Sequence, residues 1–558
     1  MSPPLTTRNV FLTGGAQGLG KSFVDALLAE GARVVFGDIN QTVGEATERE
    51  FSAKYGRDKI MFIQFDVTDG PTFEAAFQTA VNHLGYVDLM VNNAGFMIER
   101  LWEKMIQLNY AGVVRGTLLA HEHMRKDKGG RGGRIINLSS EMGLHDLPST
   151  PVYCGTKHAV RAFTSCFALA PDLSELGIEY GILCPGPANT DLMRKMDATT
   201  VRHYTQDISS ALMKRISSVE HVQSGFMKLL RLKNMNGAIL YIQHDKMNYF
   251  KMEKFNLGEN WPVPKGSPSA SSSPSRKSNT KLKTKNVFLT GGAQGLGKSY
   301  VNALLAEGAR VVFGDINSTI GAATEKEFIE KYGRDRVRFI AFDVTDGPKF
   351  EEAFQTAVNY LGYVDLMVNN AGFLNESLWE KMIQLNFTGV VRGTYLAYEH
   401  MRKDKGGKGG RIINVSSNSG LHLVLNVPVY CGTKQAVRSF TASLARSPDL
   451  QQLGVEFGTL CPGPSRTDLI RKVDPLKVRY FSHFMKNRDE SKLSAVERIQ
   501  RGFMKLALLD EMNGAILHVP AFEMKFYNVR KVKLGQSWPG LETNATSSSP
   551  PPRQKSAL

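Results

Sequence analysis

Residues 9–20 read Asn9-Val-Phe-Leu-Thr-Gly-Gly-Ala-Gln-Gly-Leu-Gly20, an apolar run followed directly by a glycine-rich loop. Helical spacing of apolar residues then extends over residues 21–31. Glycines placed between a strand and a helix let the backbone approach a pyrophosphate, which the N-terminus of the helix stabilises. The stretch therefore predicts the opening strand, phosphate loop and first helix of a dinucleotide-binding domain.

Further short apolar runs follow this stretch, with helical patterns between them. Strand and helix alternation with apolar strands indicates a parallel sheet that helices cover on both faces. The fold class we expect is therefore α/β, a doubly wound Rossmann-type domain. The additional strands are expected at residues 33–38, 60–66, 89–92, 134–138 and 179–183.

The same pattern occurs twice in the chain. The loop Thr13-Gly-Gly-Ala-Gln-Gly-Leu-Gly20 returns unchanged 277 positions later, from Thr290 to Gly297, and Tyr153 returns as Tyr430 at the same offset. A period this long indicates a duplicated domain rather than a stacking repeat, so two Rossmann-type domains in tandem are predicted. We expect a first domain at 1–264, a flexible basic Ser/Pro-rich linker at 265–285, a second domain at 286–541 and a disordered tail at 542–558.

Composition narrows the classes of function. No run of about 20 apolar residues occurs, so no membrane span is expected. The N-terminus lacks the pattern of a secretion signal, and the five cysteines are scattered without a CxxC pair, which favours the cytoplasm and no bound metal. Of the formal net charge of +16, six charges fall in the linker and the rest are spread thinly, so nucleic-acid binding is not expected.

Asp38 ends the second expected strand, where a carboxylate can accept hydrogen bonds from the adenosine ribose and repel a 2′-phosphate. No Arg or Lys stands in the glycine loop or at the strand end, so NAD is favoured over NADP. The alternative is a solvated acid in the turn before Asn40. Asp66, after the third strand, is expected to accept from the adenine amino group.

Tyr153 and Lys157 are four residues apart and share one face of a helix. An ammonium near a phenol lowers the pKa of the phenol, which is expected to supply an acid/base near neutral pH. Ser140 follows a strand end and is expected to hold the substrate oxygen while Tyr153 exchanges the proton. Taken alone, a Tyr-x-x-x-Lys pair is also compatible with two residues on a helix surface.

In order along the chain stand the glycine loop, Asn92-Asn-Ala-Gly95, Asn109, Ser140, Tyr153-x-x-x-Lys157 and Pro185-Gly186. This order resembles the short-chain dehydrogenase/reductase family, and the likeness covers both copies. The resemblance implies a catalytic tetrad in which Tyr is the acid/base, Lys holds the nicotinamide ribose, Ser orients the carbonyl and Asn anchors a water. The expected tetrads are Asn109, Ser140, Tyr153 and Lys157, and Asn386, Ser417, Tyr430 and Lys434.

The expected cofactor contacts of the two copies correspond position by position. In the first copy they are Gly14, Gly18, Leu19, Gly20, Asp38, Asp66, Val67, Asn93, Pro185 and Thr190. In the second copy they are Gly291, Gly295, Leu296, Gly297, Asp315, Asp343, Val344, Asn370, Pro462 and Thr467.

Within that family each copy is similar to the NAD-dependent 15-hydroxyprostaglandin dehydrogenases, through Trp102-Glu-Lys104, Pro151-Val-Tyr-Cys-Gly-Thr-Lys-His158, Leu183-Cys-Pro-Gly186 and Asn236-Gly-Ala-Ile239. The resemblance implies oxidation of the 15-hydroxyl of prostaglandins or related oxygenated fatty acids. One departure is that Thr150 and Val427 stand where those enzymes have a substrate-contacting Gln. The stretches after Thr190 and Thr467, expected to cover the substrate, differ most between the copies.

These observations predict an oxidoreductase that interconverts a lipophilic secondary alcohol and its ketone with NAD. Two alternatives stay open, a steroid or retinoid dehydrogenase and a non-catalytic NAD-binding protein. A further hypothesis is that the two copies pair within one chain, because the linker raises their effective concentration. His121-Glu-His123 is interpreted as a solvated helix face rather than a metal site, since residues two apart point to different faces.

Overall fold

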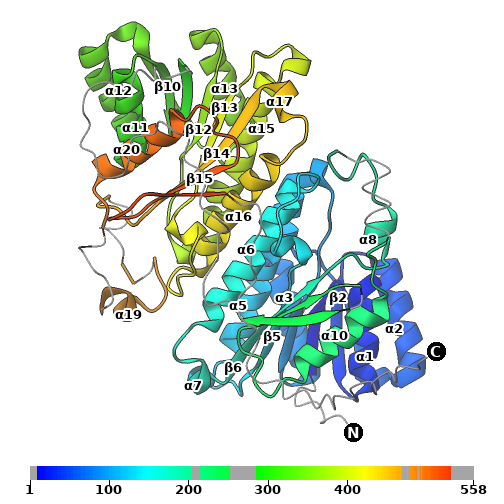
Figure 1. The fold of residues 1–558 in the computed structure, drawn as a ribbon. Coiled ribbons are helices and arrows are strands. Elements are labelled where there is room, and N and C mark those ends of the chain that lie inside the picture. The colour runs from blue at the N-terminus through cyan, green and yellow to red at the C-terminus, as the bar shows by residue number, and fades with distance from the viewer. Residues whose placement is uncertain are drawn as a thin grey trace, which may run out of the picture.

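The computed structural model describes residues 9–203, 214–244, 246–251, 285–467, 474–475, 477–486, 491 and 493–528. The linker at 265–285, apart from Lys285, and the tail at 542–558 lie outside these residues. Two sheets, each with its own helices, are formed by residues 9–251 and 285–528, here called the first and second domain (Figure 1).

The strands and helices of the first domain alternate as predicted. Its strands are β1 (Asn9–Thr13), β2 (Arg33–Asp38), β3 (Ile60–Gln64), β4 (Leu89–Asn92), β5 (Gly133–Leu138), β6 (Ile178–Pro185), β7 (Ala238–Ile242) and β8 (Met247–Lys251). Its helices are α1 (Gly18–Ala29), α2 (Gln41–Tyr55), α3 (Gly70–Leu84), α4 (Trp102–Ile106), α5 (Gly112–Met124), α6 (Pro151–Ala168), α7 (Leu173–Leu176), α8 (Asp191–Arg194) and α10 (Val219–Leu230).

The second domain repeats this series. Its strands are β9 (Asn286–Thr290), β10 (Arg310–Asp315), β11 (Val337–Ala341), β12 (Leu366–Asn369), β13 (Gly410–Val415), β14 (Val455–Pro462), β15 (Ala515–Val519) and β16 (Lys525–Asn528). Its helices are α11 (Gly295–Ala306), α12 (Ser318–Tyr332), α13 (Gly347–Leu361), α14 (Trp379–Ile383), α15 (Gly389–Met401), α16 (Pro428–Leu444), α17 (Leu450–Leu453), α19 (Phe481–Lys486) and α20 (Val496–Ala507).

The strand order in the first sheet is β3-β2-β1-β4-β5-β6-β7-β8, and the second sheet has the matching order. The order reverses between β1 and β4, and the carboxyl ends of parallel strands at such a point leave a crevice for ligands. The doubly wound parallel sheet is thereby confirmed. One feature differs from the prediction, because β8 and β16 close their sheets as antiparallel edge strands.

Helices cover both faces of each sheet, because the strands are apolar on both sides. In the first domain α1 and α10 pack on one face, where Phe23 stacks on Phe226. Helices α3, α5 and α6 cover the opposite face. Aromatic side chains of β1 and α3, such as Phe11 and Phe73, fill the space between that face and its helices.

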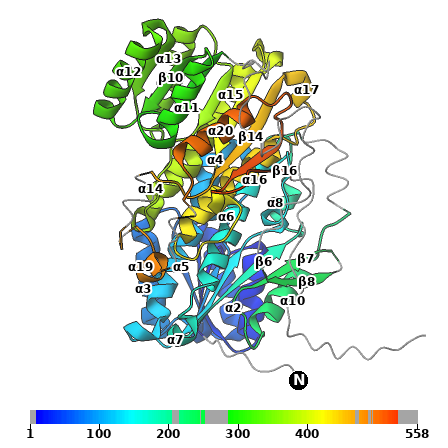
Figure 2. The ribbon, with the colours of Figure 1, turned by 60° about the vertical axis from the view of Figure 1, so that its left-hand side comes forward.

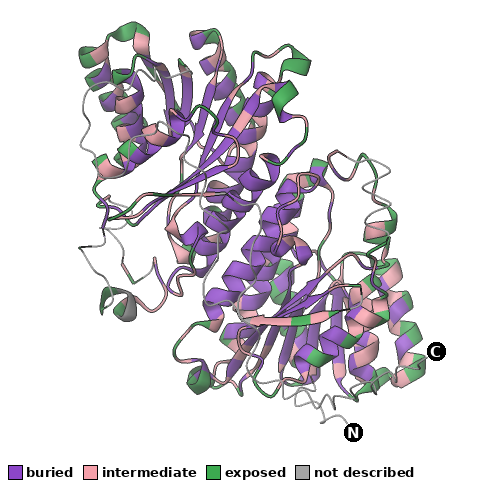
Figure 3. Cartoon of the chain, viewed as in Figure 1, coloured by how far each residue is buried: buried purple, intermediate pink, exposed green. Residues whose placement is uncertain are grey.

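Helices α6 and α16 lie side by side between the two sheets (Figures 1 and 2). Every residue from 151 to 167 and from 428 to 444 is buried, and the helices between the domains are coloured accordingly in Figure 3. Each helix is covered on one side by its own sheet and on the other by the opposite domain. A single apolar cluster therefore runs from one domain into the other, with Tyr110 and Phe387 among its members.

Candidate active site

A cavity of about 760 Å³ opens in the first domain at the carboxyl ends of β1 and β4. Residues from the glycine loop, the strand ends, α6 and α8 line it together. The structure thus gathers most of the predicted first site around one space. The lining includes Gly14, Gly18, Leu19, Gly20, Asp38, Asp66, Val67, Asn93, Ser140, Tyr153, Lys157, Pro185 and Thr190.

The glycine loop has the close backbone contacts that its sequence predicts. A Cβ atom at Gly20 would lie 1.9 Å from the carbonyl oxygen of Gly14, so no side chain fits there. Gly18 adopts a φ of +57°, which a side chain would strain, and a Cβ there would lie 3.6 Å from the Thr190 side chain. Helix α1 begins at Gly18 without a side-chain cap, so its first N–H groups are left to face the cavity. This end of the cavity is built to hold an anion.

Asp38 lies at the end of β2 and receives a hydrogen bond from Ala16 N to Oδ2 at 3.1 Å, which fixes the carboxylate beside the loop. Asp66 accepts from the backbone and hydroxyl of Thr68 at 2.9 and 2.8 Å, so one of its oxygens stabilises a turn. The Asn93 side-chain amide donates to the carbonyls of Thr13 and Gly14. The side chain of Asn93 therefore braces the glycine loop.

Tyr153 and Lys157 share the face of α6 that meets the cavity. The Lys157 ammonium donates to the Leu138 carbonyl at 3.1 Å and lies 5.6 Å from the centre of the Tyr153 ring. Ser140 follows β5 and accepts a hydrogen bond from Met142 N at 3.2 Å. Tyr153 is 9% exposed and Lys157 is 4% exposed, which rules out the alternative of a pair on the helix surface.

The acid/base chemistry differs from the simple expectation that lysine lowers the tyrosine pKa. Burial raises the pKa of Tyr153 to about 12, and hydrogen bonding with Ser140 opposes this rise. Burial also lowers the pKa of Lys157 to about 8. Desolvation disfavours both charged forms and is the largest cause of both shifts.

Asn109 lies in a π-helical turn at Gln107–Ala111, between α4 and α5. Its amide oxygen accepts from Phe96 N at 3.0 Å, and its amide nitrogen donates to the Phe96 carbonyl at 2.8 Å. A Cβ at Gly95 would lie 3.3 Å from Asn109 Oδ1 and 3.5 Å from Lys157 Nζ. Asn109 is thus close to Lys157, behind the wall of the cavity. π-turns of this kind often occur at functional sites.

Glu99 is a part of the site that the sequence did not indicate. Its buried carboxylate accepts hydrogen bonds from the backbone N–H groups of Val152 and Tyr153, at the start of α6. Burial raises the pKa of Glu99 to about 7. Because 54 residues separate Glu99 from Tyr153, local sequence carries no signal of this contact.

The second domain repeats this geometry. Lys434 Nζ donates to the Val415 carbonyl at 3.2 Å and lies 5.6 Å from the Tyr430 ring centre. Burial raises the pKa of Tyr430 to about 12 and lowers that of Lys434 to about 8. The remaining counterparts keep the same contacts: Asn386 with Phe373, Ser417 with Ser419 N, Asp315 with Ala293 N, Asn370 with Gly291, and Asp343 with Thr345.

The interpretation of His121-Glu-His123 as a solvated face was wrong for His121. Its ring is 1% exposed, with Nδ1 2.6 Å from the Tyr180 hydroxyl and Nε2 3.1 Å from Arg479 of the second domain. The prediction failed because this face of α5 is covered by the other domain. Among the described residues no group of three His, Cys, Asp or Glu side chains is placed to hold a metal, and no helix there is long and apolar enough to cross a membrane.

Residues 8–200 and 285–477 each match the short chain dehydrogenase family. These matches take in both glycine loops and both Tyr-x-x-x-Lys pairs, so the chain belongs to the short-chain dehydrogenase family and carries two copies of it. The predicted class of enzyme, an oxidoreductase acting on alcohols, is thereby confirmed.

Single-domain relatives resemble one half of the chain. The 15-hydroxyprostaglandin dehydrogenase [NAD(+)] of Rattus norvegicus is 36% identical over 246 residues, 43% of this chain and 92% of the relative. The enzyme of that name from Homo sapiens is 35% identical over 245 residues, 43% of this chain and 92% of the relative. The 3-alpha-(or 20-beta)-hydroxysteroid dehydrogenase of Mycobacterium bovis is 36% identical over 193 residues, 33% of this chain and 70% of the relative.

Solved structures share the fold over both domains. The C-domain of a bacterial malonyl-CoA reductase with NADP matches with a TM-score of 0.63 and 13% identity, over 89% of this chain and 95% of that one. The N-domain of such a reductase matches with a TM-score of 0.61 and 16% identity, over 84% and 94%. At these identities the likeness concerns the fold alone.

Proposed function

We propose that each half of the chain is an NAD-dependent dehydrogenase that interconverts a lipophilic secondary alcohol and its ketone. The observation that carries this proposal is the arrangement of Tyr153, Lys157 and Ser140 on the same cavity as the glycine loop and Asp38. Dehydrogenation of an alcohol by a dinucleotide requires an acid/base, an ammonium beside it and a loop that binds the phosphates of the cofactor. Their repetition in the second domain speaks against a purely non-catalytic role.

The cavity fits NAD. The uncapped N-terminus of α1 and Gly18 beside it, both on the cavity, would receive the pyrophosphate, and Asp38 would accept hydrogen bonds from the adenosine ribose. The carboxylate of Asp38 disfavours an added phosphate at that ribose. The relatives named for NAD(+) agree with this choice.

Bound NAD supplies the hydride acceptor for the carbinol carbon. The ionised Tyr153 oxygen takes the proton of the alcohol in oxidation, and the Tyr153 hydroxyl returns it in reduction, while Ser140 holds the reacting oxygen. Lys157, fixed by the Leu138 carbonyl, supplies positive charge beside the phenol ring and would contact the nicotinamide ribose. Tyr430, Ser417 and Lys434 perform the same steps in the second domain.

The substrate we favour is a prostaglandin or another hydroxy fatty acid, by similarity to the relatives named above. A steroid is the second candidate, because a hydroxysteroid dehydrogenase is equally similar over a shorter stretch. The two sites are expected to differ in preference. The buried carboxylate of Glu141 lines the first cavity and pairs with Arg215, whereas Asn418 stands at the equivalent place and contacts His518.

The two domains, which we assign to residues 1–264 and 286–541, are proposed to work as a pair within one chain. Support comes from α6 and α16, which pack against each other and are buried from residue 151 to 167 and from 428 to 444. Tyr110 also donates across the boundary to the Val429 carbonyl at 2.9 Å. A cytoplasmic location is proposed as well, since all five cysteines are buried and free of disulfides.

The experiment is NADH formation, followed at 340 nm, by the full chain supplied with NAD and a panel of prostaglandins, hydroxy fatty acids, steroids and retinols. Rapid NADH formation from a prostaglandin or hydroxy fatty acid supports the favoured substrate, and formation from steroids alone selects the second candidate. NAD binding without oxidation of any alcohol on the panel contradicts the catalytic proposal. Small-angle scattering of the same sample tests the pairing, which requires a compact particle of one chain.

A further inference from the structure

The boundary between the domains is built largely from equivalent residues of the two copies. Arg115 of the first domain forms an ion pair with Glu380 of the second, and Arg392 forms the matching pair with Glu103. Position 392 is the equivalent of 115, and 380 the equivalent of 103. Most of the boundary therefore follows an approximate two-fold relationship between the copies.

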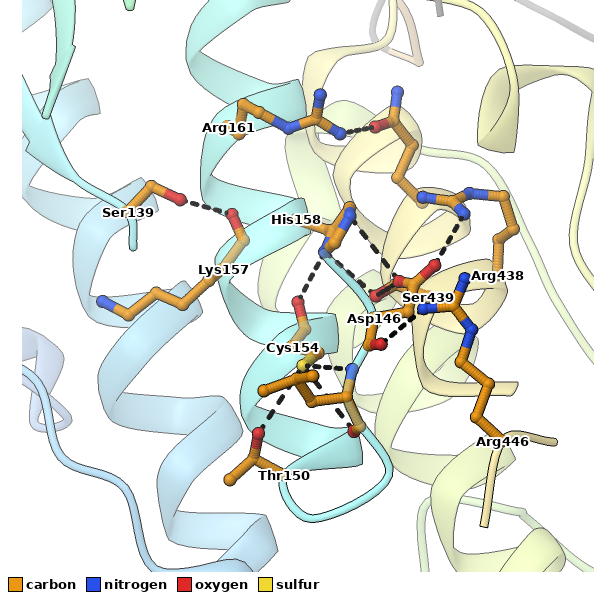
Figure 4. A network of polar contacts seen from close by, with 12 residues as sticks. Ser139, Asp146, Thr150, Cys154, Lys157, His158, Arg161, Arg438, Ser439 and Arg446 are labelled. Carbon is orange, nitrogen blue, oxygen red and sulfur yellow. Dashed lines mark hydrogen bonds and ion pairs between the residues drawn. The ribbon is translucent and has the colours of Figure 1, made fainter. Parts of the chain in front are cut away.

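The centre of the boundary breaks this relationship at Asp146. The Asp146 carboxylate, 1% exposed, accepts a hydrogen bond from the Ser439 hydroxyl at 2.6 Å and lies 3.6 Å from Arg438 Nη1 (Figure 4). Arg446 donates to the Asp146 main-chain carbonyl at 2.6 Å. The three partners all belong to the second domain. The first domain thus inserts one acid into a basic and polar surface of the second.

The equivalent positions in the other direction lack these groups. Leu423 stands where the first domain has Asp146, so the second domain offers no acid here. Opposite Leu423, the counterparts of Ser439 and Arg446 are Ala162 and Leu169, which carry no polar side chain. The acid therefore lies on the first copy, and the groups that bind its carboxylate and its main-chain carbonyl lie on the second.

Two arginines share the region around this one carboxylate. Arg161 and Arg438 occupy equivalent positions, and both side chains are fully buried. Arg161 donates to the amide oxygen of Gln435 at 3.0 Å. Burial, with Arg438 nearby, lowers the pKa of Arg161 to about 9. Burial, together with Arg161 and Arg438, also holds the pKa of His158 well below its usual range. The Asp146 carboxylate, 3.6 Å from Arg438 Nη1, offsets part of this positive charge.

We propose that Asp146 determines which surfaces pair, so that the second domain accepts the first domain as its partner and does not pair with another copy of itself. In a pair of two second domains, Leu423 would stand at the position of Asp146 on both sides. Two Arg438 side chains would then be buried there without a carboxylate from that position. An uncompensated buried charge is strongly destabilising. The inference rests on the proposed pairing within the chain, and names the residue that directs it.

The test uses the full chain. Asp146→Leu gives the first domain the residue that the second domain has at this place. We expect a particle with a larger radius of gyration by small-angle scattering, still one chain by light scattering, and a melting midpoint lowered by roughly 10 °C. An unchanged radius and midpoint would overturn the inference. Association of the variant into dimers would overturn it too, because surfaces without the acid would then be pairing.

A second variant guards against a simple failure of Asp146→Leu to fold. In Asp146→Leu/Leu423→Asp the carboxylate moves to the second domain and faces Arg161. We expect the melting midpoint to recover at least half of its loss and the radius of gyration to return to the compact value. Full recovery is not required, because Ala162 offers no hydroxyl to the new carboxylate. No recovery would mean that Asp146 supports only its own loop, which contradicts the proposal. Asp127→Asn, an exposed acid paired with Arg125 inside the first domain, is the control and should change neither value.

The two levels of the proposal fail separately. An extended wild-type particle would refute pairing within the chain. A compact wild type together with an unaffected Asp146→Leu variant would refute only the role of Asp146. Neither measurement needs an alcohol substrate.

Discussion

The Tyr480 hydroxyl of the second domain donates a hydrogen bond to the Asp172 carboxylate of the first domain at 2.8 Å. Its counterpart is His203, whose Nδ1 lies 3.8 Å from Asp449. Both residues, at φ of 50° and 49°, are the non-glycine residues with positive φ in the described part of the chain. Such conformations persist where surrounding contacts hold them. The chain that follows each expected substrate-covering stretch is therefore anchored on the opposite domain.

Removing this anchor should weaken substrate binding at the second site alone. Tyr480→Phe deletes a hydrogen bond worth about 1 kcal/mol, so we expect the KM for the alcohol to rise about five-fold while kcat stays within two-fold. The measurement is made in a Tyr153→Phe background, where only the second site turns over. Tyr332→Phe, whose hydroxyl bonds within its own domain to Asn302, is the matched control. An equal change at the first site, measured in a Tyr430→Phe background, would show that the contact acts on the whole chain instead.

Asp38→Asn should relax the choice of cofactor. The amide keeps the size of the side chain but loses the charge that repels a 2′-phosphate. In a Tyr430→Phe background we expect the ratio of kcat/KM for NAD over NADP to fall at least ten-fold. Asp315→Asn in a Tyr153→Phe background should do the same for the second site. A ratio that stays at the wild-type value would mean that these carboxylates do not face the ribose of the cofactor.

The direction of reaction should depend on pH through the tyrosines. Burial raises the pKa of Tyr153 to about 12, so the ionised form that accepts the alcohol proton is scarce at neutral pH. Below that pKa, each increase of one pH unit raises the ionised fraction of Tyr153 about ten-fold. We therefore expect alcohol oxidation to accelerate from pH 6 to 8, up to the pKa of about 8 at which Lys157 loses its charge, and ketone reduction, which needs the protonated phenol, not to accelerate. Parallel profiles in the two directions would contradict Tyr153 as the acid/base.

Glu99 should make stability fall as pH rises. Its folded-state pKa of about 7 lies above the ordinary value of 4.5, so between these pH values the unfolded chain releases a proton that the folded chain keeps. Stability is full below about pH 4.5 and is lost progressively up to about pH 7, by about 3 kcal/mol. Glu99→Gln should weaken this dependence by about half, because burial also raises the pKa of the equivalent Glu376 to about 7. Urea unfolding at pH 5 and pH 8 measures the difference, and an unaltered slope would exclude Glu99 as its source.

Much of the fold could be predicted because its signals are local. Strands β1 and β2 have the predicted limits, and the glycines between β1 and α1 lie where the loop requires them. Strands β7 and β8 were not among the predicted strands, and the short connection between Ile242 and Met247 permits only an antiparallel pair. The offset of 277 residues predicted the duplication, and the two sheets have matching strand orders.

The parts that escaped prediction depend on contacts across the boundary between domains or over long separations. His121 was predicted to lie on a solvated helix face, and the second domain covers it. Nothing in the composition of its loop singles out Asp146. Arg438 cannot be told from a surface residue of α16 without the packing of α6 against that helix. The raised pKa of Tyr153 likewise follows from burial, which the spacing to Lys157 does not report.

The most direct test of two tyrosine-dependent dehydrogenase sites compares the full chain with Tyr153→Phe, Tyr430→Phe and the double variant. NADH formation is measured with NAD and the best alcohol of the panel, after calorimetry has shown that each variant still binds NAD. We expect each single variant to lose the contribution of one site, and the double variant to lose at least a hundred-fold in kcat with NAD affinity retained. A double variant that still forms NADH at the wild-type rate would contradict the proposed chemistry at both sites.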